Sequence, residues 1–345
     1  MDRGLLAETA RALVAPTKGI LAADESTGTI QRRFDSLGAE ATEENRRGYR
    51  QLLFETDRIA DYISGVILYD ETIRQKSSEG TPLVEMLTSK GILPGIKVDA
   101  GAKPLAGASG EMVTEGLDGL RERVAEYREL GMRFTKWRAV IAIGDAIPSQ
   151  YCIDANAHAL ARFAALSQEG GLVPIVEPEI LMDGRHDIGQ CFDATEATLR
   201  AVFAELVNQR VDLEGTLLKP NMVLSGKDAD ERVGPEEVAE RTITCFKRTI
   251  PASVPGIVFL SGGQKDDEAT VNLDAINQQA GNVGVPWELS FSYGRGLQAA
   301  PLKAWDGSSE NVQQAQRAFQ HRARVTSAAR QGAYSPDMEG EFSAV

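Results

Sequence analysis

Histidine, cysteine and long apolar runs are all scarce in this chain. Its three histidines are too far apart to form the close ligand pairs of a metal site, so we expect no bound metal. Its three cysteines are odd in number and widely spaced, which predicts free thiols in a reducing compartment. No segment approaches the roughly 18 uninterrupted apolar residues of a membrane span, and the first residues carry no apolar signal-peptide core. We therefore expect a cytoplasmic protein that does not enter a membrane.

Positive charge is also in deficit. The sequence has 37 lysines and arginines against 50 aspartates and glutamates, a formal net charge of −13. This balance argues against general binding to nucleic acid or to an anionic membrane surface. An acidic protein can still bind phosphates where it gathers its cations locally. A hydrophobic content of 42% and a charged content of 25% are typical of a globular protein with a large core.

What the sequence does contain is a repeated alternation of strand-like and helix-like segments. The strand-like segments are residues 19–24, 65–70, 95–99, 134–140, 172–179, 215–223, 256–262 and 287–294. Helical patterns lie between them, at residues 43–57, 116–130, 155–168, 195–208, 234–248 and 266–280. Eight such units predict an α/β fold, the (β/α)8 TIM barrel, which typically needs about 250 residues.

Additional segments account for the rest of the 345 residues. We expect a single domain over residues 1–345, with the barrel core at about 17–300. One extra helix is predicted at about residues 5–15 and another at about 309–330. Residues 331–345 contain proline, glycine and acidic side chains, which predicts a short mobile tail.

Polar residues cluster at the ends of the predicted strands. They are Asp24, Asp99, Arg138, Glu179, Lys219, Ser261 and Arg295. In a TIM barrel these ends share one mouth, where barrel enzymes place their chemistry. Three strands also carry charged residues two positions apart: Lys97 and Asp99, Lys136 and Arg138, Glu177 and Glu179. Because residues i and i+2 of a strand lie on one face, each pair should project in one direction.

Lys219 is the most informative of these residues, because it interrupts an apolar segment and lysine is rarely buried unless it is paired or used. An amine that attacks a carbonyl must be neutral, yet free lysine titrates at about 10.4. Burial and a neighbouring cation such as Lys136 both favour the neutral amine. Glu177 and Glu179, if close, could share a proton and leave one of them as an acid. The pattern predicts an imine-forming lysine, with a structural ion network as the alternative.

Two glycine-rich turns end the last two predicted strands. They are Ser261-Gly262-Gly263 and Tyr293-Gly294-Arg295-Gly296. Glycine lets backbone N–H groups approach a phosphate, and Arg295 can bind phosphate oxygens through two hydrogen bonds. Barrels commonly bind phosphate at this position, although ordinary turn glycines are the alternative. Residues 294–299 also fit a dinucleotide-binding pattern, but no second nucleotide-binding half follows, so we expect no nicotinamide cofactor.

Several segments resemble class I fructose-1,6-bisphosphate aldolase, in the expected order over nearly the whole chain. They are residues 19–28, 42–47, 95–99, 136–138, 173–181, 213–222, 260–264 and 291–295. The resemblance implies an enzyme of glycolysis and gluconeogenesis that uses neither a metal nor another cofactor. It implies reversible cleavage of fructose 1,6-bisphosphate to dihydroxyacetone phosphate and glyceraldehyde 3-phosphate through a lysine Schiff base. Family members are commonly homotetramers.

The resemblance also implies a role for each central residue. Lys219 aligns with the Schiff-base lysine. Glu179 matches the acid/base that handles carbinolamine dehydration, with Glu177 in support. Asp24 matches the residue that helps take the proton from the C4 hydroxyl group, and Lys136 matches the lysine placed between these groups.

Two further sets of residues are implied for the phosphates. The C1-phosphate set is Ser261, Gly262, Gly294 and Arg295, with Gly263 beside them. The distal phosphate set is Ser26, Thr29, Arg33, Lys97 and Arg138. The chain departs from vertebrate and plant members by lacking their terminal tyrosine, so proton exchange on the enamine is expected to be slower or to use another group. Two other functions stay open at this point: another phosphosugar lyase or isomerase, and a non-catalytic phosphometabolite sensor.

Overall fold

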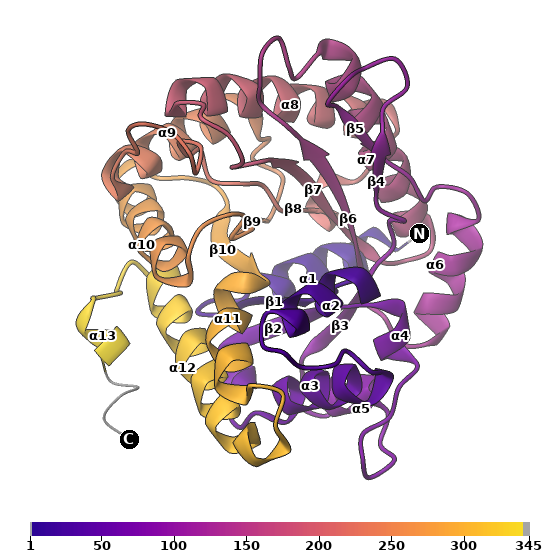
Figure 1. Cartoon of the computed structure of the whole chain (residues 1–345). Helices are drawn as coiled ribbons and strands as arrows, with labels where there is room; N and C mark the ends of the chain where they lie inside the picture. Colours follow the sequence, from indigo (N-terminus) through magenta and orange to yellow (C-terminus); the bar gives the residue numbers. More distant parts are fainter. Residues whose placement is uncertain (1, 341–345) are drawn as a thin grey trace.

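A closed barrel of parallel strands forms the centre of the protein (Figure 1). The computed structural model describes residues 2–340. Within them the barrel strands are β1 (Gly19–Ala23), β2 (Ile63–Leu68), β3 (Leu93–Lys97), β6 (Phe134–Ile141), β7 (Val173–Ile180), β8 (Leu217–Leu218), β9 (Gly256–Phe259) and β10 (Glu288–Tyr293). Their order around the barrel is β1-β10-β9-β8-β7-β6-β3-β2. The predicted TIM barrel is confirmed, although β8 is much shorter than the segment 215–223 suggested.

Helices surround this barrel on the outside (Figure 1). The longer ones are α3 (Glu43–Glu55), α6 (Leu120–Glu129), α7 (Gln150–Glu169), α8 (Ile188–Asn208), α9 (Pro235–Thr249), α10 (Asp266–Val283) and α12 (Val312–Arg330). Each coincides with a predicted helical segment. Several elements fall where none was predicted: α2 (Thr27–Asp35), α4 (Asp70–Ile73), α5 (Leu83–Thr88), α11 (Arg295–Trp305) and the antiparallel hairpin of β4 (Ala102–Pro104) and β5 (Met112–Thr114).

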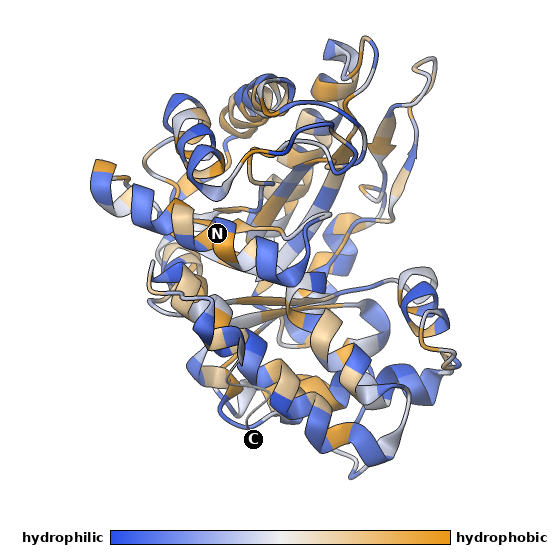
Figure 2. Cartoon of the chain, turned by 60° about the vertical axis from the view of Figure 1, so that its left-hand side comes forward, coloured by the Kyte–Doolittle hydropathy of each residue, from blue (hydrophilic) through white to orange (hydrophobic). Residues whose placement is uncertain are grey.

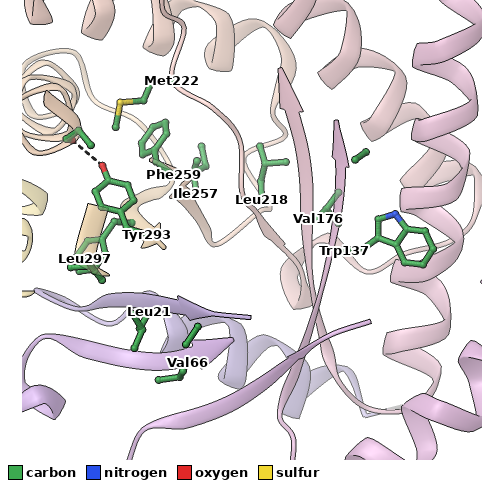
Figure 3. Packing of buried hydrophobic residues seen from close by; sticks show 14 of the residues in the cluster. Leu21, Val66, Trp137, Val176, Leu218, Met222, Ile257, Phe259, Tyr293 and Leu297 are labelled. Atoms are coloured by element: carbon green, nitrogen blue, oxygen red, sulfur yellow. Dashed lines mark hydrogen bonds between the residues drawn. The ribbon is translucent and has the colours of Figure 1, made fainter. Parts of the chain in front are cut away.

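Side chains alternate along each strand between the barrel interior and the outer layer. In β6, Phe134 belongs to the interior cluster, whereas Trp137 packs outward and stacks on Phe163 of α7 with ring centroids 5.6 Å apart. Figure 3 shows Trp137, Val176 and other buried side chains of this outer layer. Along the same strand Lys136 follows Phe134 by two positions, so it faces the interior as the charged pairs predicted.

The helix α1 (Arg3–Leu13) closes the end of the barrel opposite the mouth. Its Leu6, Ala10 and Leu13 join the apolar cluster inside the barrel. Val14, just after α1, can pack closely against β9 because residue 256 is a glycine: a Cβ there would lie 2.6 Å from Val14 Cγ1. An apolar cluster thus fills the barrel interior at the closed end, away from the charged side chains of the mouth.

The C-terminal segment packs against the helices around the barrel. Tyr334 N donates to Asp274 Oδ1 on α10 at 2.9 Å, and Arg322 of α12 pairs with Glu339 of the short helix α13 (Asp337–Gly340) at 2.5 Å. Residues 331–340 are thus attached, which the prediction of a mobile tail did not anticipate. The last part of that predicted tail, residues 341–345, lies outside the described residues.

Hydropathy along the chain follows the same layers (Figure 2). Barrel strands are largely hydrophobic, and the helices around them combine hydrophobic and hydrophilic residues. Across residues 2–340, no helix combines the length and the apolar character that crossing a membrane requires.

Candidate active site

A cavity of about 550 Å³ opens at the carboxyl ends of the strands. Nearly all the predicted site residues line it: Asp24, Ser26, Thr29, Arg33, Lys97, Lys136, Arg138, Glu177, Glu179, Lys219, Ser261, Gly262, Gly294 and Arg295. Gly263 is the exception, since it lines a separate small cavity behind the Ser261–Gly262 turn. Residues from strands far apart in sequence therefore meet at one site.

Two lysines and two carboxylates form the floor of the cavity. Lys219 Nζ lies 3.2 Å from Glu177 Oε1. Lys136 Nζ lies 3.2 Å from Glu177 Oε2 and 2.6 Å from Asp24 Oδ2. Lys219, Lys136 and Glu177 are 3% or 4% exposed, so this chain of alternating charges is almost closed to solvent.

The position of Lys219 is fixed by its backbone. Its N–H donates to the carbonyl of Val176 at 2.8 Å, which continues the β7–β8 pairing by one residue. Leu217 belongs to the interior cluster and Leu218 to the outer layer, so alternation turns Lys219 inward again. Two residues further on, Asn221 Oδ1 accepts from Ile180 N at 3.0 Å and ties the two strand ends together.

The charges of the floor shift the acid–base properties of its members. Burial raises the pKa of Asp24, but the positive charges of Lys136 and Lys219 outweigh it and lower that pKa to about 2. Burial lowers the pKa of Lys136, but Asp24 and Glu177 outweigh it and hold that pKa above its usual range. Asp24 is therefore an anion and Lys136 a cation at neutral pH.

Glu177 and Glu179 engage different cations instead of each other. Glu179 Oε2 lies 2.5 Å from Arg138 Nε, whereas Glu177 contacts the two lysines. Within residues 2–340, Glu179 forms no ion pair with Lys219. This geometry gives no support to the predicted sharing of one proton by the two glutamates. It also puts Glu177 nearer than Glu179 to the Lys219 amine.

One rim of the cavity is built from the two predicted glycine turns. Gly262 adopts a φ of +54°, which glycine reaches without strain. Arg295 donates to the carbonyl of Gly262, and Gly296 N donates to Ser261 Oγ at 3.4 Å, so the two turns are joined. Because α11 begins at Arg295, the positive end of its dipole lies at this rim. The rim thus suits an anion.

The other predicted cationic side chains of the cavity are Arg33, Lys97 and Arg138, and Arg33 is set apart by its position. Arg33 lies close to the first rim, since a Cβ on Gly294 would be 3.8 Å from Arg33 Nη2. Arg33, which was expected among the distal phosphate residues, is thus near Gly294 of the first rim. Lys97 pairs with Asp99 at 2.6 Å, and Arg138 is held by Glu179. Burial lowers the pKa of Arg138, but Glu179 outweighs it and raises that pKa above its usual range.

Some lining residues were missed from the sequence: Glu25, Arg32, Ser36 and Ser292. Glu25 is the most informative of them, because its side chain is only 5% exposed and holds Arg33 Nη1 at 2.5 Å. Gln298 Nε2 of α11 donates to the same Glu25 Oε1 at 2.8 Å. Its place in the sequence between two predicted site residues, Asp24 and Ser26, could have indicated Glu25. Strand alternation could not, because Glu25 lies beyond the end of β1.

Metal-binding and thiol chemistry have little support elsewhere in the chain. Between residues 2 and 340, no group of three or more histidine, cysteine, aspartate or glutamate side chains is arranged to hold a metal ion. The cysteines are free thiols, as predicted, and all of them are buried. Burial, followed by Glu111, raises the pKa of Cys152 to about 11, and burial, followed by Glu196, raises that of Cys245 to about 12. Both therefore stay protonated, unreactive thiols at neutral pH.

Comparison with known proteins connects this geometry to a family. A family model described as fructose-bisphosphate aldolase class-I matches residues 5–344. A probable fructose-bisphosphate aldolase class 1 from Xanthomonas axonopodis pv. citri is 60% identical over 320 residues, 92% of this chain and 95% of that protein. The cytosolic fructose-bisphosphate aldolase 4 of Arabidopsis thaliana is 55% identical over 324 residues, 94% of this chain and 82% of that protein. A solved Plasmodium falciparum fructose-bisphosphate aldolase, in complex with TRAP and a small-molecule inhibitor, has a TM-score of 0.94 and 47% identity, with 96% of each chain covered.

Proposed function

Since this chain belongs to the class I fructose-bisphosphate aldolase family, we propose that the buried charges around Lys219 carry out its reaction. The protein is a fructose-bisphosphate aldolase, EC 4.1.2.13, and its substrate is a sugar phosphate. The family is metal-independent and works through a Schiff base. The observation that carries the assignment of roles is the contact of a 4% exposed Lys219 amine with Glu177 and, through it, with Lys136.

Schiff-base formation begins at Lys219. Its neutral amine attacks the C2 carbonyl of the ketose and forms a carbinolamine. Loss of water then needs a proton on the departing C2 oxygen. Glu177, 3.2 Å from Lys219 Nζ, takes the proton that the lysine nitrogen loses and passes it to the C2 oxygen, so that water leaves and the protonated imine forms.

The two glutamates therefore have different roles in this proposal. The resemblance gave the leading acid/base role to Glu179 with Glu177 in support, and the distances favour the reverse order. Glu179 is held by Arg138 near the mouth, where it orients that guanidinium group for the substrate. Mutation separates the two assignments: Glu177→Gln should impair dehydration more than Glu179→Gln.

Cleavage of the C3–C4 bond follows. The protonated imine accepts the electron pair of that bond and becomes an enamine, while the C4 hydroxyl group loses its proton to Asp24. Glyceraldehyde 3-phosphate then leaves. Protonation of the enamine at C3 and hydrolysis of the imine release dihydroxyacetone phosphate and restore Lys219. Lys136 stays cationic beside Asp24 and stabilises negative charge that develops on the C4 oxygen.

Phosphate binding at both ends positions the sugar over Lys219. The rim formed by Ser261, Gly262, Gly294 and Arg295 is proposed to hold the C1 phosphate, with Arg33 beside it. Ser26, Thr29, Lys97 and Arg138 are proposed for the distal phosphate. Binding both phosphates aligns the substrate with the Lys219 amine, and such positioning contributes a large part of the rate enhancement. Locally gathered cations also explain how a protein of net charge −13 attracts a polyanion.

We also propose three general properties of the enzyme: its cofactor independence, its location and its oligomeric state. The enzyme acts without a metal or another cofactor, so activity should persist in EDTA. It works in the cytoplasm, as the naming of plant relatives as cytosolic suggests. It forms a homotetramer, as the family resemblance implies. Exposed apolar side chains, Tyr151 on α7 and Val207 on α8, give such an assembly surface to bury. Light scattering after gel filtration would measure the mass.

Borohydride trapping tests the central proposal. Reduction in the presence of dihydroxyacetone phosphate should attach a stable adduct to the peptide that contains Lys219, as read by mass spectrometry. Lys219→Met should give no adduct and no cleavage, whereas Lys103→Met, at an exposed lysine of β4, should behave as wild type. An adduct on another lysine, or wild-type turnover by Lys219→Met, would refute the assignment.

A further inference from the structure

A second, much smaller cavity lies directly behind the turn that forms the C1-phosphate rim. Its lining comes from the end of β7 and the segment after it, from the segment after β8, and from the turn after β9: Ile180, Leu181, Met182, His186, Cys191, Asn221, Met222, Leu224 and residues 260–264. About 10 Å³ is open to the centre of a water molecule, which corresponds to roughly one water. Gly263, the predicted site residue absent from the main cavity, lines this one.

His186 supplies an unpartnered polar side chain to this cavity. The residue is 5% exposed, and neither Nδ1 nor Nε2 has a hydrogen-bond partner within residues 2–340. Buried polar groups of proteins are nearly always hydrogen-bonded, to water where no protein group is in reach. The imidazole therefore brings an unsatisfied donor and an unsatisfied acceptor to a cavity that the turn also lines.

The position of the His186 ring is fixed by its surroundings. Its own carbonyl accepts from Gly226 N at 2.8 Å, which links the segment after β7 to the segment after β8. A Cβ on Gly226 would lie 3.2 Å from His186 Cε1, so the ring packs directly against that backbone. Burial lowers the pKa of His186, which keeps the ring neutral at physiological pH.

The phosphate turn, which also lines this cavity, is tied to α10 by Gln264. Its Nε2 donates to the carbonyl of Ser261 at 3.1 Å, and its Oε1 accepts from Asn272 Nδ2 of α10 at 2.8 Å. These bonds attach the turn to the α10 side. His186 lines the same small cavity, and within residues 2–340 its ring makes no direct hydrogen bond to the turn.

We propose that one water molecule in this cavity bridges His186 to residues 261–264, which makes His186 a positioning residue for the C1-phosphate rim. The bridge satisfies the buried imidazole and holds the turn between two supports, Gln264 on one side and the hydrated His186 on the other. His186 does not touch substrate. Its loss should affect ligands that carry the C1 phosphate and leave the distal end unaffected. This inference rests on the proposed function, because it assumes that the rim binds the C1 phosphate.

Substitution at His186 tests the proposal, with each end of the substrate measured separately. His186→Leu removes both ring nitrogens, His186→Gln keeps a donor and an acceptor, and His158→Leu changes an exposed histidine of α7 as the control. Two readouts report on the C1 phosphate. They are the kcat and KM for fructose 1,6-bisphosphate, and the concentration of dihydroxyacetone phosphate that gives half-maximal borohydride trapping. The KM for glyceraldehyde 3-phosphate in the condensation direction reports on the distal end.

His186→Leu should raise the first KM and the half-saturating concentration together, by about 2- to 10-fold, the range expected for one net hydrogen bond. Both kcat and the KM for glyceraldehyde 3-phosphate should change little. His186→Gln should recover most of the loss. Unchanged constants in His186→Leu, or equal weakening at both ends, would overturn the proposal and leave His186 a packing residue.

A crystal structure of the wild-type enzyme gives an answer that does not depend on a folded variant. Density for a water within hydrogen-bond distance of a His186 ring nitrogen and of a polar atom of residues 261–264 would support the bridge. A dry cavity would overturn it. Failure of the proposed function is distinguishable, because the wild-type enzyme would then give no borohydride adduct on Lys219.

Discussion

The ammonium group of Lys136 lies 2.6 Å from the carboxylate of Asp24 at the floor of the barrel mouth. Each group keeps the other charged, which is how two ionised side chains stay so deep in the protein. Glu177 continues the contact to Lys219. The reactive amine therefore lies at the end of a fixed sequence of charges and not in an apolar pocket.

Removing the central cation should disable the reaction. Lys136→Met should lower kcat by about 10² to 10⁴, the usual range for one positioned acid–base group, because the developing charge on the substrate loses its cation. It should also lower the melting temperature, since Asp24 and Glu177 lose a buried partner. Lys103→Met is the matched control for an exposed lysine. A folded Lys136→Met enzyme with near wild-type kcat would contradict the role given to Lys136.

The low pKa of Asp24 predicts how stability depends on pH. With a pKa of about 2 in the folded protein and about 3.8 when unfolded, the ionised carboxylate contributes about 2 kcal/mol above pH 4. Because the folded pKa is depressed, this contribution is lost as pH falls from about 4 toward 2. The difference in unfolding free energy between wild type and Asp24→Asn should therefore shrink over that window.

Chemical denaturation at a series of pH values measures this difference. Asp145→Asn, at an exposed aspartate, should show no such trend. A difference that stays constant down to pH 2 would mean that Asp24 is not held as an anion by its lysines.

Glu25 should control the affinity for phosphate through Arg33. Glu25→Gln removes the buried charge that holds Arg33 Nη1 and should raise the KM for fructose 1,6-bisphosphate about 10-fold, the scale of one charge-assisted hydrogen bond. kcat should change less, because Arg33 is proposed to bind phosphate and not to take part in the reaction at Lys219. Glu44→Gln, which breaks the exposed pair with Arg47, is the control. A lower KM would show that Glu25 competes with the phosphate for Arg33.

The barrel and its charged mouth could be predicted from sequence because both follow from strand alternation. Strand alternation turns Lys136, Glu177 and Lys219 toward the same interior, where the structure shows them in contact. The resemblance extended this to loop residues such as Ser26 and Arg295. Both lie in the cavity that was expected.

Features that depend on contacts between distant segments could not be predicted in this way. The pairing of Glu177 with two lysines and of Glu179 with Arg138 is set by rotamers and by barrel register, which residue spacing does not specify. The position of Arg33 beside Gly294 could not be foreseen, because α2, the helix that carries it, was not predicted. No role could be predicted for His186 from the sequence, because the cavity beside it is formed by segments that follow different strands.

A pair of glycine substitutions should shift stability in opposite directions. Gly95 in β3 faces the ring of Phe134, and a Cβ there would lie 2.2 to 2.4 Å from ring carbons, so Gly95→Ala should destabilise the protein by about 1 to 3 kcal/mol or more. Gly48 in α3 has open space around it, so Gly48→Ala should stabilise the helix by about 0.5 to 1 kcal/mol. Urea denaturation of both variants measures the two shifts. Adding Phe134→Leu to Gly95→Ala should recover part of the loss, because the smaller side chain makes room in the barrel interior. Equal effects of the two alanines would mean that the ring of Phe134 does not fill the space beside Gly95, and that the closed end of the barrel is packed differently.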